Sequence, residues 1–307
     1  MRDLPALPAS MRLFERDWLS SNNLMLFDGD RATLVDTGYD SHKHTTLALV
    51  MHALAERPGC RLERILNTHL HSDHCGGNAL LAARLGARIS VPAATFDAVR
   101  AWDASSLTYA ALAQTCERFP VDDRLAPGDR FVAGATEWHA LAAPGHDPTS
   151  LIFFAPEHGL LLSADALWAN GFGLLFPEFE GESGIAEQRA TLALIETLDA
   201  RVVVPGHGPM FADVTEAIAR ARRRLDAIEA DIDSHLRHAM RALIMFRMLA
   251  QRHERIESLI DAYRDAHLMH AMAARLGMDT ATAFREAIDS LVTGGQLEQD
   301  GAFLRCR

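Results

Sequence analysis

The sequence predicts an α+β protein in which two β-sheets pack face to face with helices outside, followed by a mostly helical segment. Three observations support this. Short β-type runs alternate with helical stretches over the first two-thirds of the 307 residues. The strands fall into two blocks, each ending in helices, as expected for a layered sandwich. From about Thr215 the pattern becomes almost wholly helical. We therefore expect two domains, residues 1–214 and 215–307.

The first block is marked by turn and stop signals. Asp28-Gly29-Asp30 is typical of a hairpin turn, and Pro58-Gly59 and Gly86 are typical of helix ends. Between these signals, short apolar runs indicate strands and a period near four indicates helices. The predicted strands are 11–14, 24–27, 32–35, 65–67 and 89–91, and the predicted helices are 41–56, 78–85 and 96–101.

After Pro127-Gly128 the apolar period shifts towards two, which predicts a second block of strands. A single helix is expected before the last strand. The predicted strands are 130–132, 137–141, 150–154, 160–163 and 201–204, and the predicted helix is 185–198.

The C-terminal segment has apolar residues at helical spacing over residues 215–234 and 239–267. Shorter elements follow: a helix at 268–276, a break at Gly277, a helix at 280–292 and a hairpin at Asp300-Gly301. This is the order of a winged helix, for which DNA binding is one interpretation. The helix at 280–292, however, has one arginine against Glu286 and Asp289, which favours a structural or dimerising cap. The apolar stripe Leu243-Met245-Phe246-Leu249 favours a homodimer contact.

Charge and composition exclude several classes of partner. Residues 215–307 hold 14 basic and 14 acidic groups, so the net charge of -11 belongs to residues 1–214. Such a surface repels polyanions, and we expect neither nucleic acid nor an anionic membrane as a partner. The N-terminus has no signal-peptide pattern, no apolar run approaches a membrane span, and the four cysteines lack CxxC spacing. We therefore expect a cytoplasmic protein with reduced thiols.

The most informative motif is His69-Leu70-His71-Ser72-Asp73-His74, which follows the apolar run Ile65-Leu66. His69 and His71 flank one residue, so in an extended loop both can reach one ion. Asp73 and His74 begin the next turn and can face a neighbouring ion. Neutral imidazoles with an anionic carboxylate are the donors that a catalytic divalent metal site requires. Cys75, which follows the motif, is expected to pack beside the site rather than to bind metal.

Three further ligand-type residues follow predicted strands. They are His146 in Pro144-Gly145-His146, Asp165 in Ser163-Ala164-Asp165, and His207 in Pro205-Gly206-His207. Proline and glycine allow the chain to leave a sheet abruptly, and side chains at strand ends converge on one edge. Each residue alone has a structural explanation, such as a turn or a helix cap. Together with the motif they predict a metal site with seven donors, which is more than one tetrahedral ion can use.

The chain resembles the metallo-β-lactamase superfamily over roughly residues 10–212. The resemblance rests on Asp36 in Leu34-Val35-Asp36-Thr37-Gly38, the 69–74 motif, His146, Asp165 and His207, all in the family's order. It implies an αββα sandwich with two metal ions. His69, His71 and His146 would hold one ion, Asp73, His74 and His207 the other, and Asp165 would bridge them. Asp36 would orient a ligand histidine or the motif loop.

The complete ligand set favours hydrolysis over redox chemistry. Flavodiiron members typically have Glu where this chain has His71, and persulfide dioxygenases lack a functional second ligand set. In the expected mechanism two cations acidify a water, the resulting hydroxide attacks, and Asp73 orients it and moves a proton. Zinc suits imidazole and carboxylate donors, while iron and manganese also accept them.

Substrate signals come from an aromatic, glycine-containing loop after Asp165. Trp168, Asn170, Phe172 and Phe176 are the candidate substrate residues, in a loop that continues to Phe179. A helical C-terminal domain is similar to that of glyoxalase II, yet Lys43 is the only lysine and Arg222-Arg223-Arg224 the only dense basic run. We therefore expect a small ester, lactone or thioester without a large anionic group. The alternatives are a metal-loaded signalling or protein-binding protein with vestigial activity, and a phosphodiesterase.

Overall fold

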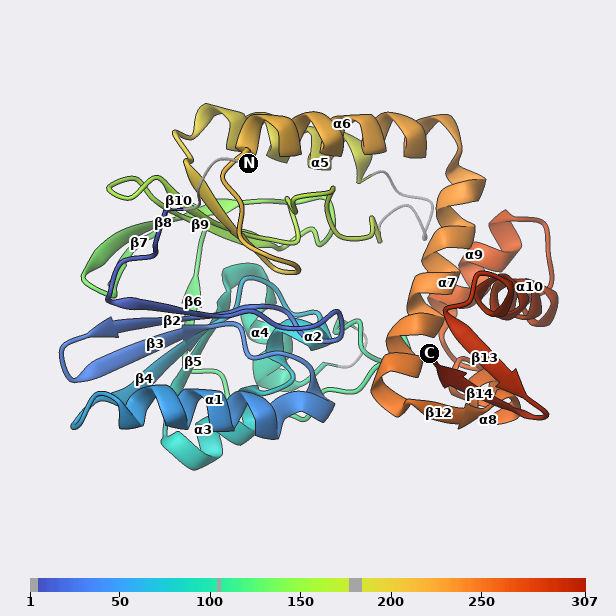
Figure 1. Ribbon diagram of the computed structural model, residues 1–307, viewed down its shortest axis with the longest axis horizontal. Coiled ribbons are helices and arrows are strands. Elements are labelled where there is room, and N and C mark those ends of the chain that lie inside the picture. The colour runs from blue at the N-terminus through green and yellow to red at the C-terminus, as the bar shows by residue number, and fades with distance from the viewer. Residues whose placement is uncertain (1–4, 104–105, 177–183) are drawn as a thin grey trace.

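The computed structural model describes residues 5–103, 106–176 and 184–307. Its first sheet has six strands in the order β1-β2-β3-β4-β5-β6, and β3 to β6 run parallel (Figure 1). Sequence patterns predict the first five of these strands but not β6, whose exposed Asp123 and Arg124 give no apolar alternation. The strands are β1 (Met11–Phe14), β2 (Asn23–Asp28), β3 (Arg31–Val35), β4 (Arg61–Leu66), β5 (Arg88–Pro92) and β6 (Asp123–Leu125).

The second sheet has five strands in the order β11-β10-β9-β8-β7. Only the β10–β11 pair is parallel. Every residue of β9 and β10 is buried, which explains their continuous apolar sequences: helices cover the outer face while the first sheet covers the inner one. The strands are β7 (Arg130–Ala133), β8 (Thr136–Ala142), β9 (Leu151–Ala155), β10 (Leu160–Ala164) and β11 (Val202–Pro205).

Helices cover both outer faces, so the part of the chain that contains the two large sheets has four layers as predicted (Figure 1). Between the sheets lies an apolar core around Leu26, Trp138 and Phe153, all at most 1% exposed. The outer face of the first sheet packs under α1 (Lys43–Ala55), α3 (Asn78–Leu85) and α4 (Phe96–Ala101). The outer face of the second packs under α5 (Ile185–Thr197) and α6 (Val214–Ala230). The short helices are α2 (Ser72–Cys75) and the 3-10 turns η1 (Asp40–His42) and η2 (Ala93–Thr95).

The C-terminal segment is a helical unit with a small sheet of order β12-β14-β13. The helical spacing over 239–267 does not correspond to one helix: α7 ends at Gln251, and the next residue, Arg252, has a left-handed φ of 66°. The break between α6 and α7 falls at Asp231, whose side chain caps α7 by accepting from Ser234 N at 2.9 Å. The elements are α7 (Ile232–Gln251), β12 (His253–Arg255), α8 (Ile256–Ala262), α9 (His267–Arg275), α10 (Thr280–Thr293), β13 (Leu297–Asp300) and β14 (Phe303–Cys306).

Helix α6 belongs by packing to the sandwich. Its Ala217 and Leu225 lie in the same buried cluster as Leu192 of α5. Helices α7 to α10 instead form a separate cluster around Met240, Ile244 and Phe284. The division of the chain into two domains remains a proposal, and this packing favours a boundary at the α6–α7 junction rather than at 214/215.

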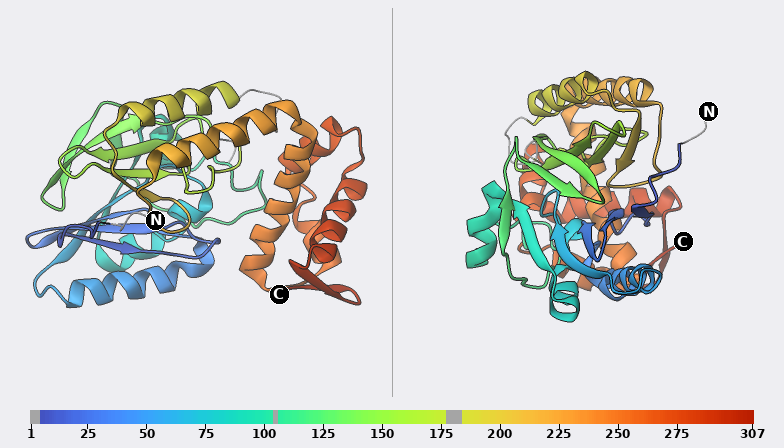
Figure 2. Two further views of the ribbon diagram at one scale, coloured as in Figure 1. Left: turned by 45° about the horizontal axis from the view of Figure 1, so that its top comes forward. Right: turned by 90° about the vertical axis from the view of Figure 1, so that its left-hand side faces the viewer.

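Helix α7 crosses one end of the sandwich, from the α6 side to the α1 side (Figures 1 and 2). Phe246 on α7 contacts Tyr39 of the first sheet's loops, with ring centroids 5.1 Å apart. Leu243 of the same stripe is buried in the C-terminal core. The apolar stripe is therefore used within the chain, which removes the observation behind the homodimer. The dimer stays a prediction, as does the absence of nucleic-acid binding.

Among the described residues, no helix has the length and apolar character needed to cross a bilayer.

Candidate metal centre

The candidate ligands lie where strands of both sheets end. The 69–74 motif follows β4, Asp165 follows β10, and His207 follows β11. His146 lies in the connection from β8 to β9. Because β8 and β10 both pair antiparallel with β9, their carboxyl ends share one edge. The fold thus collects residues more than a hundred positions apart at one end of the sandwich.

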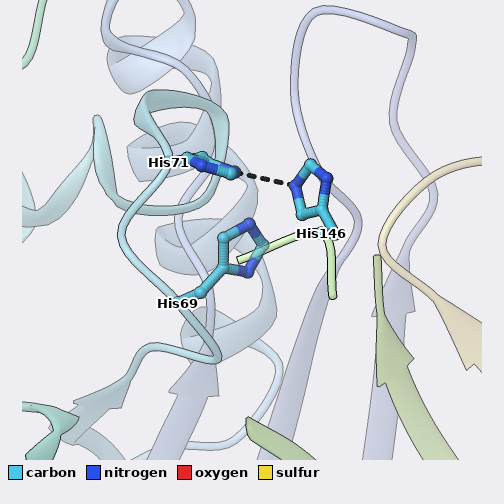
Figure 3. Close-up of side chains that lie close together, drawn as sticks. All are labelled: His69, His71 and His146. Carbon is cyan, nitrogen blue, oxygen red and sulfur yellow. Dashed lines mark hydrogen bonds between the residues drawn. The ribbon is translucent and has the colours of Figure 1, made fainter. Parts of the chain in front are cut away.

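His69, His71 and His146 form the first group, and the potential ligand atoms lie within 4.8 Å of one another (Figure 3). His71 Nδ1 lies 2.7 Å from His146 Nε2. Two nitrogens at about 2.05 Å from one tetrahedral ion would be roughly 3.3 Å apart, so a small separation of the rings would suit zinc. All three side chains are buried, with at most 5% exposure.

Asp73, His74, Asp165 and His207 form the second group, again within 4.8 Å. His207 Nε2 lies 3.0 Å from Asp73 Oδ2. Asp165 faces both groups: its Oδ1 is 3.5 Å from His74 Nε2, and its Oδ2 is 3.3 Å from His146 Nε2. One carboxylate therefore has an oxygen directed at each set of donors.

Asp36 supports the ligands from behind. Its Oδ2 lies 2.8 Å from His74 Nδ1 and accepts from Thr68 Oγ1 at 2.8 Å. The Thr68 amide donates to Asp36 Oδ1 at 2.9 Å, and Thr68 Oγ1 lies 3.1 Å from His69 Nδ1. A carboxylate behind a ligand imidazole fixes its orientation and leaves the opposite nitrogen for the metal. Asp36 also has a left-handed φ of 57°, a costly conformation for a residue other than glycine.

Two glycines provide clearance for ligand side chains. A Cβ on Gly206 would lie 2.1 Å from Asp165 Oδ1, and a Cβ on Gly173 would lie 2.4 Å from His146 Nδ1. Either contact would displace a donor. The glycine in the Pro-Gly-His sequence at His207 is therefore needed for close approach to the Asp165 carboxylate as well as for the turn itself.

The loop between β1 and β2 positions the second group, a role that sequence patterns did not indicate. Ser21 N donates to Asp73 O at 3.0 Å. Asn22 N donates to Gly206 O at 2.7 Å, and Asn22 Nδ2 donates to Pro205 O at 3.0 Å and Gly208 O at 2.7 Å. These bonds fix the segment carrying His207. No signal marks Asn22 in the sequence, because its partners lie about 183 positions away.

Local electrostatics holds several donors in the form that metals bind. Burial lowers the pKa of His69 well below its ordinary value, and burial with nearby His146 lowers that of His71 to about 4. Burial opposes ionisation of Asp165, but His74 and His207 hold its pKa well below the usual range. Burial would also lower the pKa of His74, yet Asp165 and Asp36 raise it well above 6.5. A cation binding at His74 would displace that proton.

The surroundings of two buried imidazole nitrogens indicate whether metal ions fit the two donor groups. His69 Nε2 has no hydrogen-bond partner among the described residues, His74 Nε2 has only the long 3.5 Å contact with Asp165 Oδ1, and both rings are 0% exposed. An unpaired buried polar atom costs about 1–3 kcal/mol. Both atoms belong to the two donor groups, and a divalent ion in each group would supply the missing partner. The donor set therefore fits a dinuclear site; Cys75 belongs to neither group.

The candidate substrate residues separate in the structure. Trp168 lies at the site: its Nε1 donates to Asp165 Oδ1 at 3.2 Å, and its ring is 5.3 Å from that of His207. Phe176 contacts His71 at 4.8 Å between centroids. Asn170 is exposed in the turn after Trp168. Phe172 is 0% exposed within the core under α5 and α6, so it does not line the site as expected. Residues 177–179 of the expected loop lie outside the described residues.

Trp18 also lies beside the candidate ligands, although no sequence pattern marks it. It is 63% exposed, its ring stacks on His207 with centroids 5.7 Å apart, and its edge meets Trp168 at 5.5 Å. A tryptophan at this position carries no signal in the sequence. It lies beside His207 only because the β1–β2 loop approaches the loop after β11.

The basic run Arg222-Arg223-Arg224 on α6 has structural partners. Arg222 pairs with Glu196 at 2.6 Å and Arg223 with Glu216 at 3.2 Å, both at the surface. Arg224 donates to Phe172 O at 2.7 Å and lies over the Phe172 ring. The run therefore ties α6 to α5 and to the loop after β10, and these contacts do not form an anion clamp at the ligands.

Comparison with known proteins identifies the family. Residues 16–207 match the model of the metallo-beta-lactamase superfamily, so the chain belongs to that superfamily. The matched region spans Asp36 and all seven candidate ligands. The fold likeness extends further: a metallo-beta-lactamase family protein from Thermus thermophilus covers 98% of this chain and 100% of its own, with 21% identity and a TM-score of 0.58. A metallo-beta-lactamase from Pontibacter korlensis covers 72% of this chain and 97% of its own, at 17% identity and a TM-score of 0.54.

Curated relatives match part of this chain in sequence. A hydroxyacylglutathione hydrolase from Cereibacter sphaeroides is 38% identical over 127 residues, which is 41% of this chain and 42% of the relative. One from Rhodospirillum rubrum is 29% identical over 192 residues, 61% of this chain and 65% of the relative. The chain thus spans between about two-fifths and two-thirds of the length of these relatives.

Proposed function

We propose that this chain is a dinuclear metal-dependent hydrolase that cleaves a small ester, lactone or thioester. The observation that carries the proposal is the position of Asp165, whose two oxygens face two separate sets of histidine donors. In this proposal His69, His71 and His146 would hold one ion, Asp73, His74 and His207 would hold the other, and Asp165 would serve both. Zinc suits these donors, and iron or manganese would also be accepted.

Bound cations supply Lewis acidity, which lowers the pKa of water from about 15.7 towards 7 and polarises the acyl oxygen. The chain's own contribution includes Asp73. Burial opposes its ionisation, but the hydrogen bond with His207 and the charge of His74 lower its pKa, so it stays a carboxylate. An ionised Asp73 accepts a hydrogen bond from the attacking water and orients it. Trp168 donates to Asp165 Oδ1 and restrains that carboxylate.

The surroundings favour a substrate without a large anionic group. Lys43, the only lysine, pairs with Asp40 at 2.9 Å and Glu117 at 3.0 Å. Trp18 and Trp168 instead offer aromatic surface beside His207. The relatives named hydroxyacylglutathione hydrolase add support for the thioester class, so acyl thioesters belong in any substrate search.

The test is turnover of the metal-loaded chain on acyl esters, lactones, acyl thioesters and an activated phosphodiester. We expect an acyl substrate to be cleaved, and Asp73→Asn to lower kcat roughly a hundredfold or more. Metal content is measured in parallel to separate lost orientation from lost metal. Asp97→Asn, a change at an exposed aspartate on α4, is the control. Wild-type turnover by Asp73→Asn would reject the mechanism.

Other outcomes of the same panel decide between the alternatives. Preference for the phosphodiester would favour the phosphodiesterase. No turnover at full metal loading would favour a signalling or protein-binding role with vestigial activity. The expected partner is a small-molecule substrate, with neither nucleic acid nor membrane.

A further inference from the structure

Two thiols lie close together beside the metal motif, outside both donor groups. Cys75 Sγ and Cys116 Sγ are 3.8 Å apart, although 41 positions separate the residues. Cys75 is the last residue of α2 and is fully buried, whereas Cys116 is half-buried. Packing beside the site, which is the role expected for Cys75, therefore does not explain why a second thiol lies next to it.

The surroundings of the pair link it to the metal motif. Cys75 Sγ donates to His71 O at 3.3 Å and to Leu70 O at 3.6 Å. It also lies 3.2 Å from Tyr109 OH. The thiol thus contacts the backbone of a candidate ligand, and its own residue directly follows His74.

Cys116 lies in the segment 107–119, which contains no helix or strand. This segment contacts two parts of the molecule. Gln114 Oε1 accepts from Ser72 Oγ of α2 at 2.5 Å, and Leu112 is buried in the C-terminal core. A bond between the two sulfurs would therefore join the metal motif to a segment already packed on the C-terminal helices.

We propose that Cys75 and Cys116 form a reversible disulfide, a modification site that loosens the hold of α2 on the second metal group. The sulfurs must approach by about 1.8 Å to reach bonding distance, a shift that an irregular segment can make. Oxidation removes the Cys75 donor from two buried carbonyls and moves the end of α2 that carries Asp73 and His74. The effect on metal rests on the proposed dinuclear site, whereas the disulfide itself does not.

A peroxide is the oxidant class that balances the reaction. The more exposed Cys116 sulfur attacks one peroxide oxygen, so that an S–O bond forms, the O–O bond breaks and water leaves. Cys75 then attacks the Cys116 sulfenic acid. The S–S bond forms, the S–O bond breaks, and the departing hydroxide takes the Cys75 proton as water. The two thiols lose two electrons and the peroxide gains them.

The experiment uses the full metal-loaded chain and the double variant Cys60→Ser, Cys306→Ser, which leaves only the proposed pair. After brief treatment with hydrogen peroxide, free thiols are alkylated and peptides are mapped by mass spectrometry. We expect a linked Cys75–Cys116 peptide that disappears on treatment with dithiothreitol. Cys116→Ser, a change at a half-buried position, should give no such peptide. Free thiols in the double variant, a link of either residue to Cys60 or Cys306 in the wild-type chain, or sulfinic acid at Cys116 without a link would overturn the proposal.

A second readout follows metal release to a chromophoric chelator. We expect the oxidised double variant to release its more labile metal several-fold faster than the reduced form, and Cys116→Ser to show no such difference after the same treatment. Equal rates with the disulfide formed would overturn the effect on the metal group. If the reduced chain binds no metal, the proposed function fails, while the mapped disulfide still stands or falls on its own.

Discussion

At the scale of single residues, the site contains two kinds of residue: the candidate metal ligands and the neighbours that position them. Asp36 and Thr68 orient imidazoles from behind, and Gly206 and Gly173 leave space in front of Asp165 and His146. Such neighbours have no donor role but set the geometry of the donors. Trp18 differs from them, because it contacts a candidate ligand and still has most of its surface in solvent.

Trp18→Ala is expected to raise KM about tenfold with a smaller change in kcat, since it removes apolar contact area beside His207 and leaves the donors in place. Trp18→Phe should recover most of the loss. Steady-state kinetics on the best acyl substrate of the panel checks this. Val132→Ala, an exposed apolar position on β7, is the control. An unchanged KM would mean that Trp18 does not contact substrate.

At the scale of elements, loops do most of the positioning. The β1–β2 loop fixes both Asp73 and the segment after β11, and the Trp168–Phe176 loop contacts donors of both groups. Strands bring the ligands to one edge, but the loops determine their final separation. The loss of one loop contact should therefore affect metal before it affects the fold.

Asn22→Ala is expected to lower the metal stoichiometry after dialysis, because it frees the carbonyls of Pro205 and Gly208 on the segment carrying His207. Removing the two bonds should also cost about 2 kcal/mol of unfolding free energy. Elemental analysis and urea unfolding measure both effects. Asn23→Ala is the matched control, since Asn23 at the start of β2 bonds to Ser21 O and accepts from Arg16 Nη1, and neither bond reaches the segment carrying His207. Full metal retention by the Asn22 variant would contradict the positioning role.

His235 on α7 gives a pH test of the contact between the C-terminal unit and the loop after β10. Burial lowers its pKa to about 4, and the ring bonds to the Leu175 backbone. The folded pKa lies below the unfolded value near 6.5, so the contribution of the neutral His235 ring to the free energy of unfolding is complete above pH 6.5. This contribution is lost as the pH falls from 6.5 towards 4, by about 1.4 kcal/mol per pH unit.

Urea unfolding at pH 7.5 and pH 5 should therefore show the wild type losing about 2 kcal/mol more than His235→Gln. His44→Gln, a change at an exposed histidine on α1, is the control and should follow the wild type. Identical losses in wild type and His235→Gln would show that His235 is not the group responsible.

The structure is most predictable from the sequence where its chemistry is local. The strand-end ligands are indicated by Pro-Gly-His and by the 69–74 motif, and the family match covers them all. No sequence signal marks the helix break at Arg252, because a non-glycine residue takes the left-handed conformation there. None marks Trp18 or Asn22, because their contacts depend on loops that meet across two sheets. Phe172 is buried in the core rather than at the site, because aromatic character alone does not distinguish a site wall from a core.

At the scale of the whole molecule, the sandwich and the C-terminal unit meet near the donors. Phe246 of α7 contacts Tyr39, and Phe176 packs between His71 and the C-terminal core. The C-terminal helices thus support the side of the site that the two sheets leave uncovered.

The whole chain is expected to bind two metal equivalents, because seven donors in two groups exceed what one tetrahedral ion can use. Elemental analysis of protein purified without chelator should approach this value. Asp165→Ala should lose both ions more readily, since it removes the anion between two cations. A ceiling of one equivalent in excess metal would exclude the dinuclear site.

The wide spacing of the donors has a consequence for how the protein is made. During synthesis the chain exposes residues 69–74 early, but His146, Asp165 and His207 leave the ribosome much later. Neither donor group is complete until the second sheet has formed and docked on the first. The first group would be complete only after translation through residue 146 and the second only after residue 207, so a shorter nascent or truncated chain would hold an ion in the second group by a few donors at most. Retained metal thus reports that both halves of the sandwich have assembled.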